Sequence, residues 1–560
     1  MTESIDTRPT AARLLAASLA AHGVDRMFSV AGESYLSLLD ALHDMPEIDL
    51  VTCRHEGSAG FMAVADAKLT GRAGVCLASR GPGAANAAIA VHAANEDATP
   101  LVLLVGGVTT DESDRESFQD FDAGRLFGGL AKAVWTVQEP ENLNEFLTRA
   151  FSLAESGTPG AVVIVLPENM LTRPTDAQPT RRTEVEVMEP PEASLAKVRR
   201  LLAAAQRPVL LVGSRLNRSG GREAIRAVAE RHRLPVLASN KNQHLFDNRD
   251  PQYAGHLHNN TQAAQLSALD RSDLVVAVGT RLDVVTTKEH TFPGSPEPHQ
   301  PLVHVYPDTG RLGAYHRPEV GICADPLAFL RALAGSPPIV PSGDRDAWIA
   351  ELHGIEERKA RWEPIQAPDG VVFGAVGAAL DDLTNGDVTI VVDSGTFTSW
   401  IYRYVRFGRR GRLVGISSSA MGFGIPGGVA AALRCAGAGT PVVAIVGDGG
   451  FLMNPSELIT AVERHLPLVI VVANNGSYGT IRLHQEREYP GRVTATELEN
   501  PDFARLAEAF GAAGFTATTD REVRACLLKA LANDGPAIVD VRTSLSHITA
   551  YKTIPVDRGR

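Results

Sequence analysis

Short runs of β-branched and other apolar residues recur along this chain between Ala- and Leu-rich stretches, and glycine follows each run closely. The clearest runs are at residues 75–78, 101–105, 209–212, 274–278, 388–392 and 442–446. Uninterrupted apolar runs of this length are typical of strands buried on both faces, as in parallel sheets with helical crossovers. The sequence therefore predicts an α/β protein with doubly wound parallel sheets. Ligands should bind at the carboxyl ends of the strands, where the glycines fall.

The length and two linker-like stretches predict how the chain is divided. With 560 residues the chain is longer than one hydrophobic core usually supports. Residues 172–191 and 336–343 are rich in proline and polar residues, which is typical of connections between domains. We expect three domains of ordinary size, at residues 1–180, 190–340 and 360–550.

Composition excludes several classes of function. The formal net charge is -11 and no cluster of Lys and Arg stands out, which argues against a nucleic-acid groove or an anionic membrane surface. No run approaches the roughly 18 apolar residues of a membrane span. The 5 cysteines include no Cys-x-x-Cys pair, which argues against a disulfide framework and for a reducing compartment. We expect a cytoplasmic protein that binds small molecules, with no nucleic-acid or membrane partner.

The most informative segment joins two turns. Gly447-Asp448-Gly449-Gly450 follows the apolar run at 442–446, and Asn474-Asn475 follows the next such run, after 23 intervening residues. Both turns should face one crevice, because the carboxyl ends of neighbouring parallel strands share an edge of the sheet. Carboxylate and amide oxygens are ligands that suit Mg²⁺ beside phosphate oxygens. Either turn alone is more often an ordinary loop, but the combination predicts a diphosphate cofactor bridged by Mg²⁺.

These motifs resemble the thiamine diphosphate signature of the superfamily that includes acetolactate synthase, pyruvate decarboxylase and benzoylformate decarboxylase, and the chain looks most like the acetolactate synthase-like proteins. The resemblance covers nearly the whole chain. It implies a pyrimidine-binding domain, a central domain and a diphosphate-binding domain, in that order. It also implies that Asp448, the side chain of Asn475 and the backbone carbonyl of Ser477 hold Mg²⁺.

Further positions match segments that contact the cofactor in this superfamily. They are Pro82, Asn86, Gly395, Thr396, Phe397, Ser419, Met421, Gly449, Gly450, Tyr478 and Gly479. Met421 would be the apolar residue that wedges between the two rings of the cofactor and bends it. Without the resemblance, Met421 would read as a gap-filling core residue.

Glu56, in Arg54-His55-Glu56, matches the glutamate that binds the pyrimidine ring and activates the cofactor in the superfamily. From the residues alone it could equally be a solvated carboxylate at a helix start. In the superfamily this glutamate and the Mg²⁺ ligands belong to different subunits. The resemblance therefore implies at least a homodimer, and a homotetramer is the expected assembly.

The chain departs from its relatives where they choose their substrate. Glu33 stands where pyruvate decarboxylases carry Asp, benzoylformate decarboxylase Ser and acetolactate synthases Gly. It is the candidate for a second catalytic proton-transfer group, with a plain helix-start carboxylate as the alternative. Gly106-Gly107 replaces a Gly-Gln pair of the synthases, and His484 replaces a tryptophan that favours a larger acceptor.

Other residues resemble the donor pocket of the synthases. Phe118, Gln119 and Lys132 match a phenylalanine, a glutamine and a lysine that line it. Arg80 lies in Ser79-Arg80-Gly81-Pro82, which resembles a synthase loop beside the pyrimidine. With His484, these residues form the predicted substrate pocket.

Other segments could suggest FAD or a further metal. Loops at 212–214, 279–283 and 305–308 resemble FAD-binding positions of the synthases, but Gly128 stands where those enzymes use an arginine, so FAD is doubtful and stays an open alternative. His256-Leu257-His258 could suggest a metal, yet a His-x-His pair without a third ligand is more often an ordinary loop.

These inferences predict a thiamine diphosphate- and Mg²⁺-dependent enzyme that acts on a 2-oxo acid. It would decarboxylate this donor and either protonate the product or transfer it to an aldehyde or a second 2-oxo acid. The alternatives are an enzyme like 2-hydroxyacyl-CoA lyase or oxalyl-CoA decarboxylase, an FAD-dependent oxidase, and a relative that binds the cofactor without turnover. The donor and the acceptor depend on single side chains of the pocket and are left open.

Overall fold

The structure is a computed structural model that describes residues 8–183, 185–340, 343–437 and 439–555. The described residues form three six-stranded sheets. Every pairing between strands in these sheets is parallel. Each apolar run named above lies in a strand, so the predicted α/β class with parallel sheets is confirmed.

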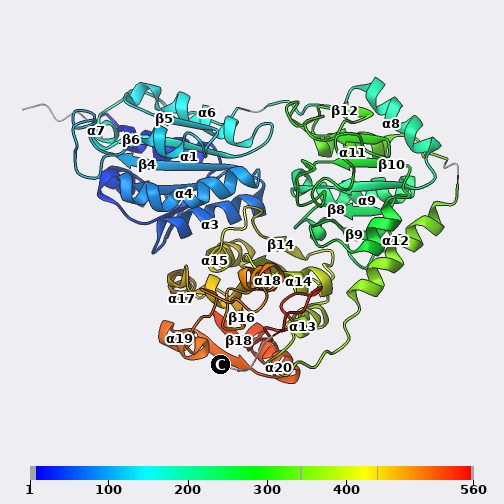
Figure 1. Cartoon of the computed structure of the whole chain (residues 1–560). Coiled ribbons are helices and arrows are strands. Elements are labelled where there is room, and N and C mark those ends of the chain that lie inside the picture. The colour runs from blue at the N-terminus through cyan, green and yellow to red at the C-terminus, as the bar shows by residue number, and fades with distance from the viewer. Residues whose placement is uncertain (1–7, 184, 341–342, 438, 556–560) are drawn as a thin grey trace, which may run out of the picture. The chain divides into compact units, whose positions relative to one another are not determined.

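The first sheet has the strand order β2-β1-β3-β4-β6-β5. Its strands are β1 Arg26–Ser29, β2 Asp49–Thr52, β3 Gly74–Ser79, β4 Leu101–Gly107, β5 Ala133–Thr136 and β6 Ala161–Pro167. Its helices are α1 Ala11–Ala21, α2 Leu36–His43, α3 Glu56–Thr70, α4 Arg80–Glu96, α5 Ala123–Phe127, α6 Leu143–Glu155 and α7 Glu168–Thr172, with short 3-10 helices at η1 Glu33–Tyr35 and η2 Pro140–Asn142. Helices α1, α2 and α6 cover one face and α3 and α4 the other (Figure 1).

The second sheet has the order β12-β11-β10-β7-β8-β9. Its strands are β7 Pro208–Val212, β8 Val236–Ala238, β9 Tyr253–His256, β10 Leu274–Val278, β11 Leu302–Val305 and β12 Val320–Ile322. Its helices are α8 Glu192–Ala204, α9 Gly221–His232, α10 Ala263–Leu269, α11 Pro326–Gly335 and α12 Arg345–Ala360, with 3-10 helices at η3 Ser214–Leu216 and η4 Gln243–Leu245. Helices α8, α9 and α11 pack on one face, and α10 and α12 pack on the other.

The third sheet, β14-β13-β15-β16-β18-β17, repeats the strand order of the first. Its strands are β13 Thr389–Val392, β14 Arg412–Val414, β15 Val442–Gly447, β16 Leu468–Asn474, β17 Ala513–Ala517 and β18 Ala537–Arg542. The helices along this part of the chain are α13 Gly374–Thr384, α14 Thr398–Tyr404, α15 Gly424–Cys435, α16 Asp448–Phe451, α17 Leu458–Glu463, α18 Gly479–Glu488, α19 Phe503–Phe510 and α20 Asp520–Leu531, with η5 Pro455–Glu457. Helices α13, α14 and α20 share one core with the sheet.

The strand orders fix where ligands should bind. The direction of winding reverses between β1 and β3 in the first sheet and between β13 and β15 in the third. Open parallel sheets bind ligands at the carboxyl ends of the strands that flank such a reversal. These are the loops that carry Glu33 and Arg80 in the first sheet and Gly395 and Asp448 in the third.

Contacts group the described chain into two compact units, each made of several segments. The first unit contains the chain up to Val185 together with Gly415–Arg434 and Gly450–Leu466. The second contains Glu186–Val414, Cys435–Gly449 and the chain from Pro467 onward. Within the first unit the Phe423 ring packs edge-on against Phe61, with 5.6 Å between centroids, and Arg434 pairs with Asp25 and Asp66.

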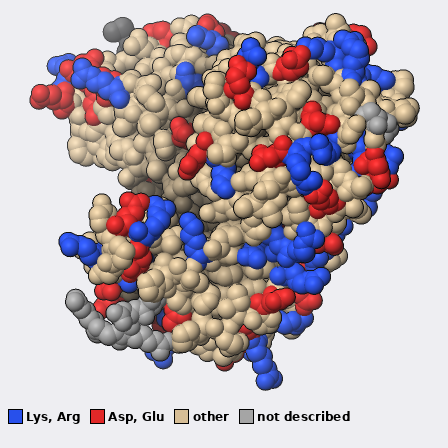
Figure 2. Space-filling view, turned by 45° about the vertical axis from the view of Figure 1, so that its right-hand side comes forward, with Lys and Arg blue, Asp and Glu red and all other residues tan. Residues whose placement is uncertain are grey.

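The predicted linkers lie between helices. Among the described residues from 173 to 191, which join α7 to α8, there is no helix or strand, apart from an isolated bridge between Thr10 and Pro174. No helix in the described part of the chain is long and apolar enough to cross a membrane. All 5 cysteines lie within the described residues and are free thiols. Figure 2 shows Lys and Arg interspersed with Asp and Glu on the face in view.

Candidate active site

Asp448 directly follows β15, at the winding reversal of the third sheet. Its side chain is buried, Oδ1 accepts a hydrogen bond from the Gly449 amide (2.9 Å), and Oδ2 accepts one from the Gly476 amide (2.8 Å). Burial raises the pKa of the Asp448 carboxyl, although these hydrogen bonds act in the opposite direction. A buried carboxylate in this state gains from a cation beside it, because its charge has lost most of its hydration.

An amide network surrounds Asp448. Asn500 Nδ2 donates to Asp448 Oδ2 (2.8 Å) and to Asn474 Oδ1 (3.0 Å), and Asn474 Nδ2 donates to Asp540 Oδ1 (2.9 Å). The buried Oδ1 of Asn500 accepts no hydrogen bond from the described residues. The sequence motif marks Asn474, but no pattern marks Asn500 or Asp540, so their part in this network was not predicted.

The oxygen atoms at this edge fit a divalent cation. Besides the Asp448 carboxylate they include the side-chain oxygen of Asn475, which accepts the Ser477 amide (3.0 Å), and the Ser477 carbonyl nearby in the chain. Within the described residues, no three or more His, Cys, Asp or Glu side chains come together as a metal site. A cation here would therefore rely on amide and backbone oxygens, which are hard ligands that Mg²⁺ accepts.

Predicted cofactor segments meet at the same edge. A Cβ added to Gly447 would lie 2.9 Å from Phe397 Cε1, and one added to Gly449 would lie 2.5 Å from Tyr478 Cε1. The Thr396 amide donates to Thr480 Oγ1 (3.1 Å). The structure thus brings together the segments with Gly395 to Phe397, Gly449 and Gly450, and Tyr478 and Gly479. Their glycines give backbone amides close access to a ligand.

Glu56 begins α3, in the connection that follows β2, the edge strand of the first sheet. Its Oε2 accepts a hydrogen bond from Asn86 Nδ2 (2.9 Å) in α4. A Cβ added to Gly83 would lie 3.2 Å from Glu56 Oε1, so a side chain at residue 83 would crowd the carboxylate. The structure therefore brings the predicted residues Glu56 and Asn86 together beside the α4 turn that also holds the exposed Pro82.

A second glutamate anchors the turn that carries Glu56. The side chain of Glu457 is fully buried, and its Oε1 accepts the amides of Arg54 (2.9 Å) and His55 (3.2 Å). Its Oε2 accepts the Thr460 hydroxyl (3.0 Å). Burial raises the pKa of Glu457. The sequence interpretation missed this residue, because residues 455–465 read as an ordinary helix.

The segment with Ser419 and Met421 belongs to the same compact unit as Glu56. Ser419 has a positive φ of 57° and is exposed, while Met421 is half-buried. Gly422 has φ +85°, and its carbonyl accepts Asn454 Nδ2 (2.9 Å), which holds the turn after Met421.

The two carboxylates Glu33 and Glu168 share one arginine in the first unit. Arg80 Nη1 donates to Glu33 Oε1 (2.7 Å), and Arg80 Nη2 donates to Glu168 Oε2 (2.9 Å). Glu33 was a predicted site residue, whereas Glu168 was not, since nothing in its sequence context distinguishes it from other helix-start glutamates.

Two other predicted pocket residues lie near Arg80. The Gln119 carbonyl accepts the Gly81 amide (2.9 Å), next to Arg80, and the neighbouring Phe118 is 74% exposed. His484 lies on α18 in the second unit, exposed, with its Nδ1 3.0 Å from Arg487 Nη2.

Lys132 lies at the opposite edge of the first sheet. It directly precedes β5, and its amide donates to the carbonyl of Ala161, the first residue of β6. Its Nζ donates to the carbonyls of Leu153 (2.6 Å), Ser156 (3.0 Å) and Thr158 (2.8 Å). The structure therefore does not bring Lys132 together with Phe118 and Gln119.

Comparison with known proteins decides the family. Three domain descriptions match: the thiamine pyrophosphate enzyme N-terminal TPP binding domain at residues 9–126, the central domain at 195–333 and the C-terminal TPP binding domain at 393–541. The chain belongs to the thiamine pyrophosphate enzyme family.

Several relatives of this thiamine pyrophosphate enzyme align along almost their whole length. The acetolactate synthase isozyme 2 large subunit of Escherichia coli is 31% identical over 527 residues, which covers 94% of each chain. The acetolactate synthase large subunit of Parasynechococcus marenigrum is 31% identical, over 96% of this chain and 88% of its own. The acetolactate synthase large subunit IlvB1 of Mycobacterium tuberculosis is 30% identical, over 95% and 87%.

Several predicted site residues fall within the matched domains. Glu33, Glu56 and Arg80 lie in the N-terminal TPP binding domain, and Asp448 and Asn475 lie in the C-terminal one. The predicted family is therefore confirmed, together with the thiamine diphosphate-binding domains.

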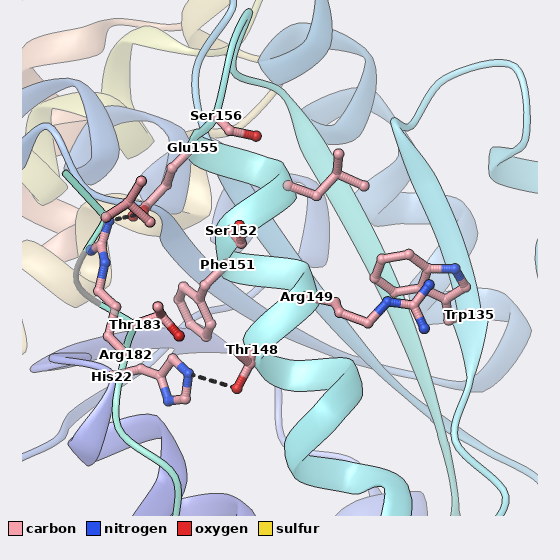
Figure 3. A pocket seen from close by; sticks show the side chains of 12 residues that line it. His22, Trp135, Thr148, Arg149, Phe151, Ser152, Glu155, Ser156, Arg182 and Thr183 are labelled. Carbon is pink, nitrogen blue, oxygen red and sulfur yellow. Dashed lines mark hydrogen bonds and ion pairs between the residues drawn. The ribbon is translucent and has the colours of Figure 1, made fainter. Parts of the chain in front are cut away.

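A separate pocket of about 690 Å³ lies on the N-terminal domain of the enzyme, along α6 (Figure 3). His22 stacks on Phe151 in its wall, Arg149 stacks on Trp135, and Arg182 pairs with Glu155. Because α6 ends beside the loop that binds Lys132, the pocket lies toward the amino edge of the sheet, away from Glu33 and Arg80.

His256 and His258 form a buried pair in the central domain. Their rings stack with 4.7 Å between centroids. Burial holds the pKa of His256 far below its usual value and lowers that of His258 to about 3. Both imidazoles are therefore neutral core groups at physiological pH.

Proposed function

We propose that this thiamine pyrophosphate enzyme is a Mg²⁺-dependent carbon–carbon lyase or ligase acting on a 2-oxo acid. Two observations carry the proposal: the Glu56–Asn86 hydrogen bond in the first unit, and in the second unit a buried Asp448 carboxylate held by the amides of Gly449 and Gly476 and by Asn500. The names of the relatives, all acetolactate synthases, support a 2-oxo acid as donor. An aldehyde or a second 2-oxo acid would be the acceptor when ligation follows.

Named residues of the chain would perform distinct tasks. Asp448, Asn475 and the Ser477 carbonyl would hold Mg²⁺ and through it the diphosphate. Thiamine diphosphate, when bound, supplies the nucleophilic carbon and the electron sink for bond cleavage.

The carboxylates would control protons. Glu56 would hold a proton at the pyrimidine ring, in an orientation set by Asn86. Glu33, exposed at the end of β1, would exchange the second proton with the substrate. The glycine-rich edge around Gly447 and Gly449 would seat the diphosphate against backbone amides.

Assembly and location complete the proposal. The family resemblance supports a homodimer or homotetramer with sites formed between copies, and a cytoplasmic protein. FAD is the remaining cofactor question. A purified protein with a flavin absorption band near 450 nm, a general flavin property, would add FAD to the assignment.

Proton NMR of the reaction tests the proposal. The protein is incubated with thiamine diphosphate, Mg²⁺ and a panel of 2-oxo acids, alone and with aldehydes, beside Glu56→Gln and the exposed control Glu47→Gln. We expect carbon dioxide release with aldehyde or acyloin formation in the parent and in Glu47→Gln, and at least a hundredfold loss in Glu56→Gln. Undiminished turnover in Glu56→Gln would refute the mechanism, and turnover of acyl-CoA substrates alone would assign the enzyme to the acyl-CoA lyases.

A further inference from the structure

Three charged side chains from three different strand ends meet at the substrate edge of the first sheet. Glu33 begins η1 after β1, Arg80 begins α4 directly after β3, and Glu168 begins α7 directly after β6. β4 lies between β3 and β6 and ends in Gly106 and Gly107. A Cβ added to Gly106 would overlap Ser34 Oγ, so this glycine leaves the space that η1, with Glu33, occupies.

The arginine side chain is much less exposed than the two carboxylates. The Arg80 side chain is 12% exposed, compared with 63% for Glu33 and 40% for Glu168. Each carboxylate uses one oxygen on a separate Nη atom of Arg80. A guanidinium group is planar and rigid, so the position of Glu168 fixes the direction in which Arg80 holds Glu33.

The backbone around the cluster is also fixed. A Cβ added to Gly32 would overlap Ser79 Cβ, and Ser34 Oγ lies 2.8 Å from Ser79 Oγ. Arg80 has a positive φ of 48°, a strained conformation for a residue with a side chain. Such strain persists where the surroundings determine the conformation, and it often marks functional sites.

We propose that Arg80 and Glu168 are positioning residues for Glu33, which they hold in one orientation for proton transfer. This inference rests on the proposed function, in which Glu33 exchanges the second proton. It also gives Arg80, predicted as a pocket residue, a specific task. Both of its Nη atoms bind protein carboxylates, so Arg80 orients Glu33.

The charges around Glu33 set the sign of the pH response. Arg80 at the start of α4 and Glu168 at the start of α7 are its charged neighbours, and Asp40 of the neighbouring α2 pairs with Arg13. Tyr35 and Cys76 are also ionisable, and Glu56 interacts electrostatically with both of them; burial raises the pKa of Tyr35 to about 12 and raises that of Cys76 as well. Neither titrates near neutral pH. Removing the Glu168 charge therefore leaves Arg80 paired with Glu33 alone, which favours the ionised form of Glu33.

The test combines Glu33→Gln, Glu168→Gln and the double variant on the full-length enzyme. We expect Glu168→Gln to lower kcat about tenfold with little change in KM, and to move the pH-profile limb that Glu33→Gln removes toward lower pH. In the Glu33→Gln background, Glu168→Gln should have no further effect. Arg80→Lys keeps the positive charge but lacks the two Nη atoms that bind separate carboxylates, so it should be as impaired as Arg80→Gln.

Other outcomes distinguish a failure of the positioning role from a failure of the proposed function. Equal losses from Glu168→Gln in both backgrounds, or a raised KM with kcat unchanged, would overturn the positioning role. Full activity in Glu33→Gln, with Glu56→Gln inactive, would overturn this inference and leave the proposed function standing. Activity in Glu56→Gln would overturn the proposed function itself.

Discussion

The buried Glu457 predicts a sharp difference between two substitutions at one position. Glu457→Ala would leave the amides of Arg54 and His55 without their acceptor. An orphaned buried amide costs about 1–3 kcal/mol, so the loss is about 2–6 kcal/mol in the local stability of the turn before Glu56. Even about 2 kcal/mol corresponds to about 30-fold faster hydrogen exchange at these amides.

Glu457→Gln should behave differently, because its amide oxygen can still accept both N–H groups. Burial raises the pKa of Glu457, so the folded state disfavours the ionised carboxylate. The stability that this group contributes is full below its unfolded pKa and is lost as the pH rises through the higher folded pKa. Glu457→Gln removes this dependence. We expect it to stay within about 1 kcal/mol of the parent and to gain on the parent as the pH rises.

Hydrogen–deuterium exchange of the peptide at residues 53–58 provides the assay, with kcat measured in parallel. Glu457→Ala should lose about 100-fold in kcat, because Glu56 follows the released turn directly. Glu463→Gln is the matched control, since Glu463 also pairs with Arg54 but is exposed, and such surface pairs contribute about 0–1 kcal/mol. Unchanged exchange and unchanged kcat in Glu457→Ala would refute the anchoring role.

Three further predictions concern the cofactor site and the assembly. Burial raises the pKa of Asp448, so protons compete with Mg²⁺ for this carboxylate. Mg²⁺ affinity, measured by calorimetry, should therefore fall about tenfold per pH unit below the pKa of Asp448. Asp448→Asn should abolish this pH dependence. The Cβ introduced by Gly449→Ala would press on Tyr478, so this variant should bind thiamine diphosphate at least about tenfold more weakly. Gly335→Ala is the control, because its Cβ meets nothing within 4 Å and should leave the affinity unchanged. Equal affinities of the two variants would exclude close packing at Gly449. Mixing Glu56→Gln with Asp448→Asn subunits should restore about a quarter of the parent activity if sites form between two copies, and no recovery after subunit exchange would place each site within one copy.

The parts of the fold that the sequence predicts best are those with a continuous local pattern. Strands such as β4 and β15 are buried on both faces, so their apolar runs need no knowledge of partners. The motif residues Glu56 and Asn86 were likewise predicted, and the structure joins them by a hydrogen bond.

The residues that the sequence does not reveal depend on packing between distant segments. Glu457 binds amides 403 and 402 positions away, and alone it looks like any polar residue of a short helix. Lys132 illustrates the opposite difficulty. The sequence spacing between Lys132 and Gln119 does not reveal that Lys132 precedes the edge strand β5. Lys132 therefore lies at the amino edge of the sheet, which the sequence could not predict.

The grouping of Gly415–Arg434 and Gly450–Leu466 with the N-terminal residues bears on protein engineering. A fragment that ends near residue 180 would lack the carboxylate that binds the turn before Glu56 and the arginine that pairs with Asp25 and Asp66. A chimera that joins the N-terminal domain of one relative to the remainder of another would mismatch the same contacts. Recombination between homologues should therefore transfer these two segments together with the N-terminal domain, although they lie more than 200 residues further along the chain.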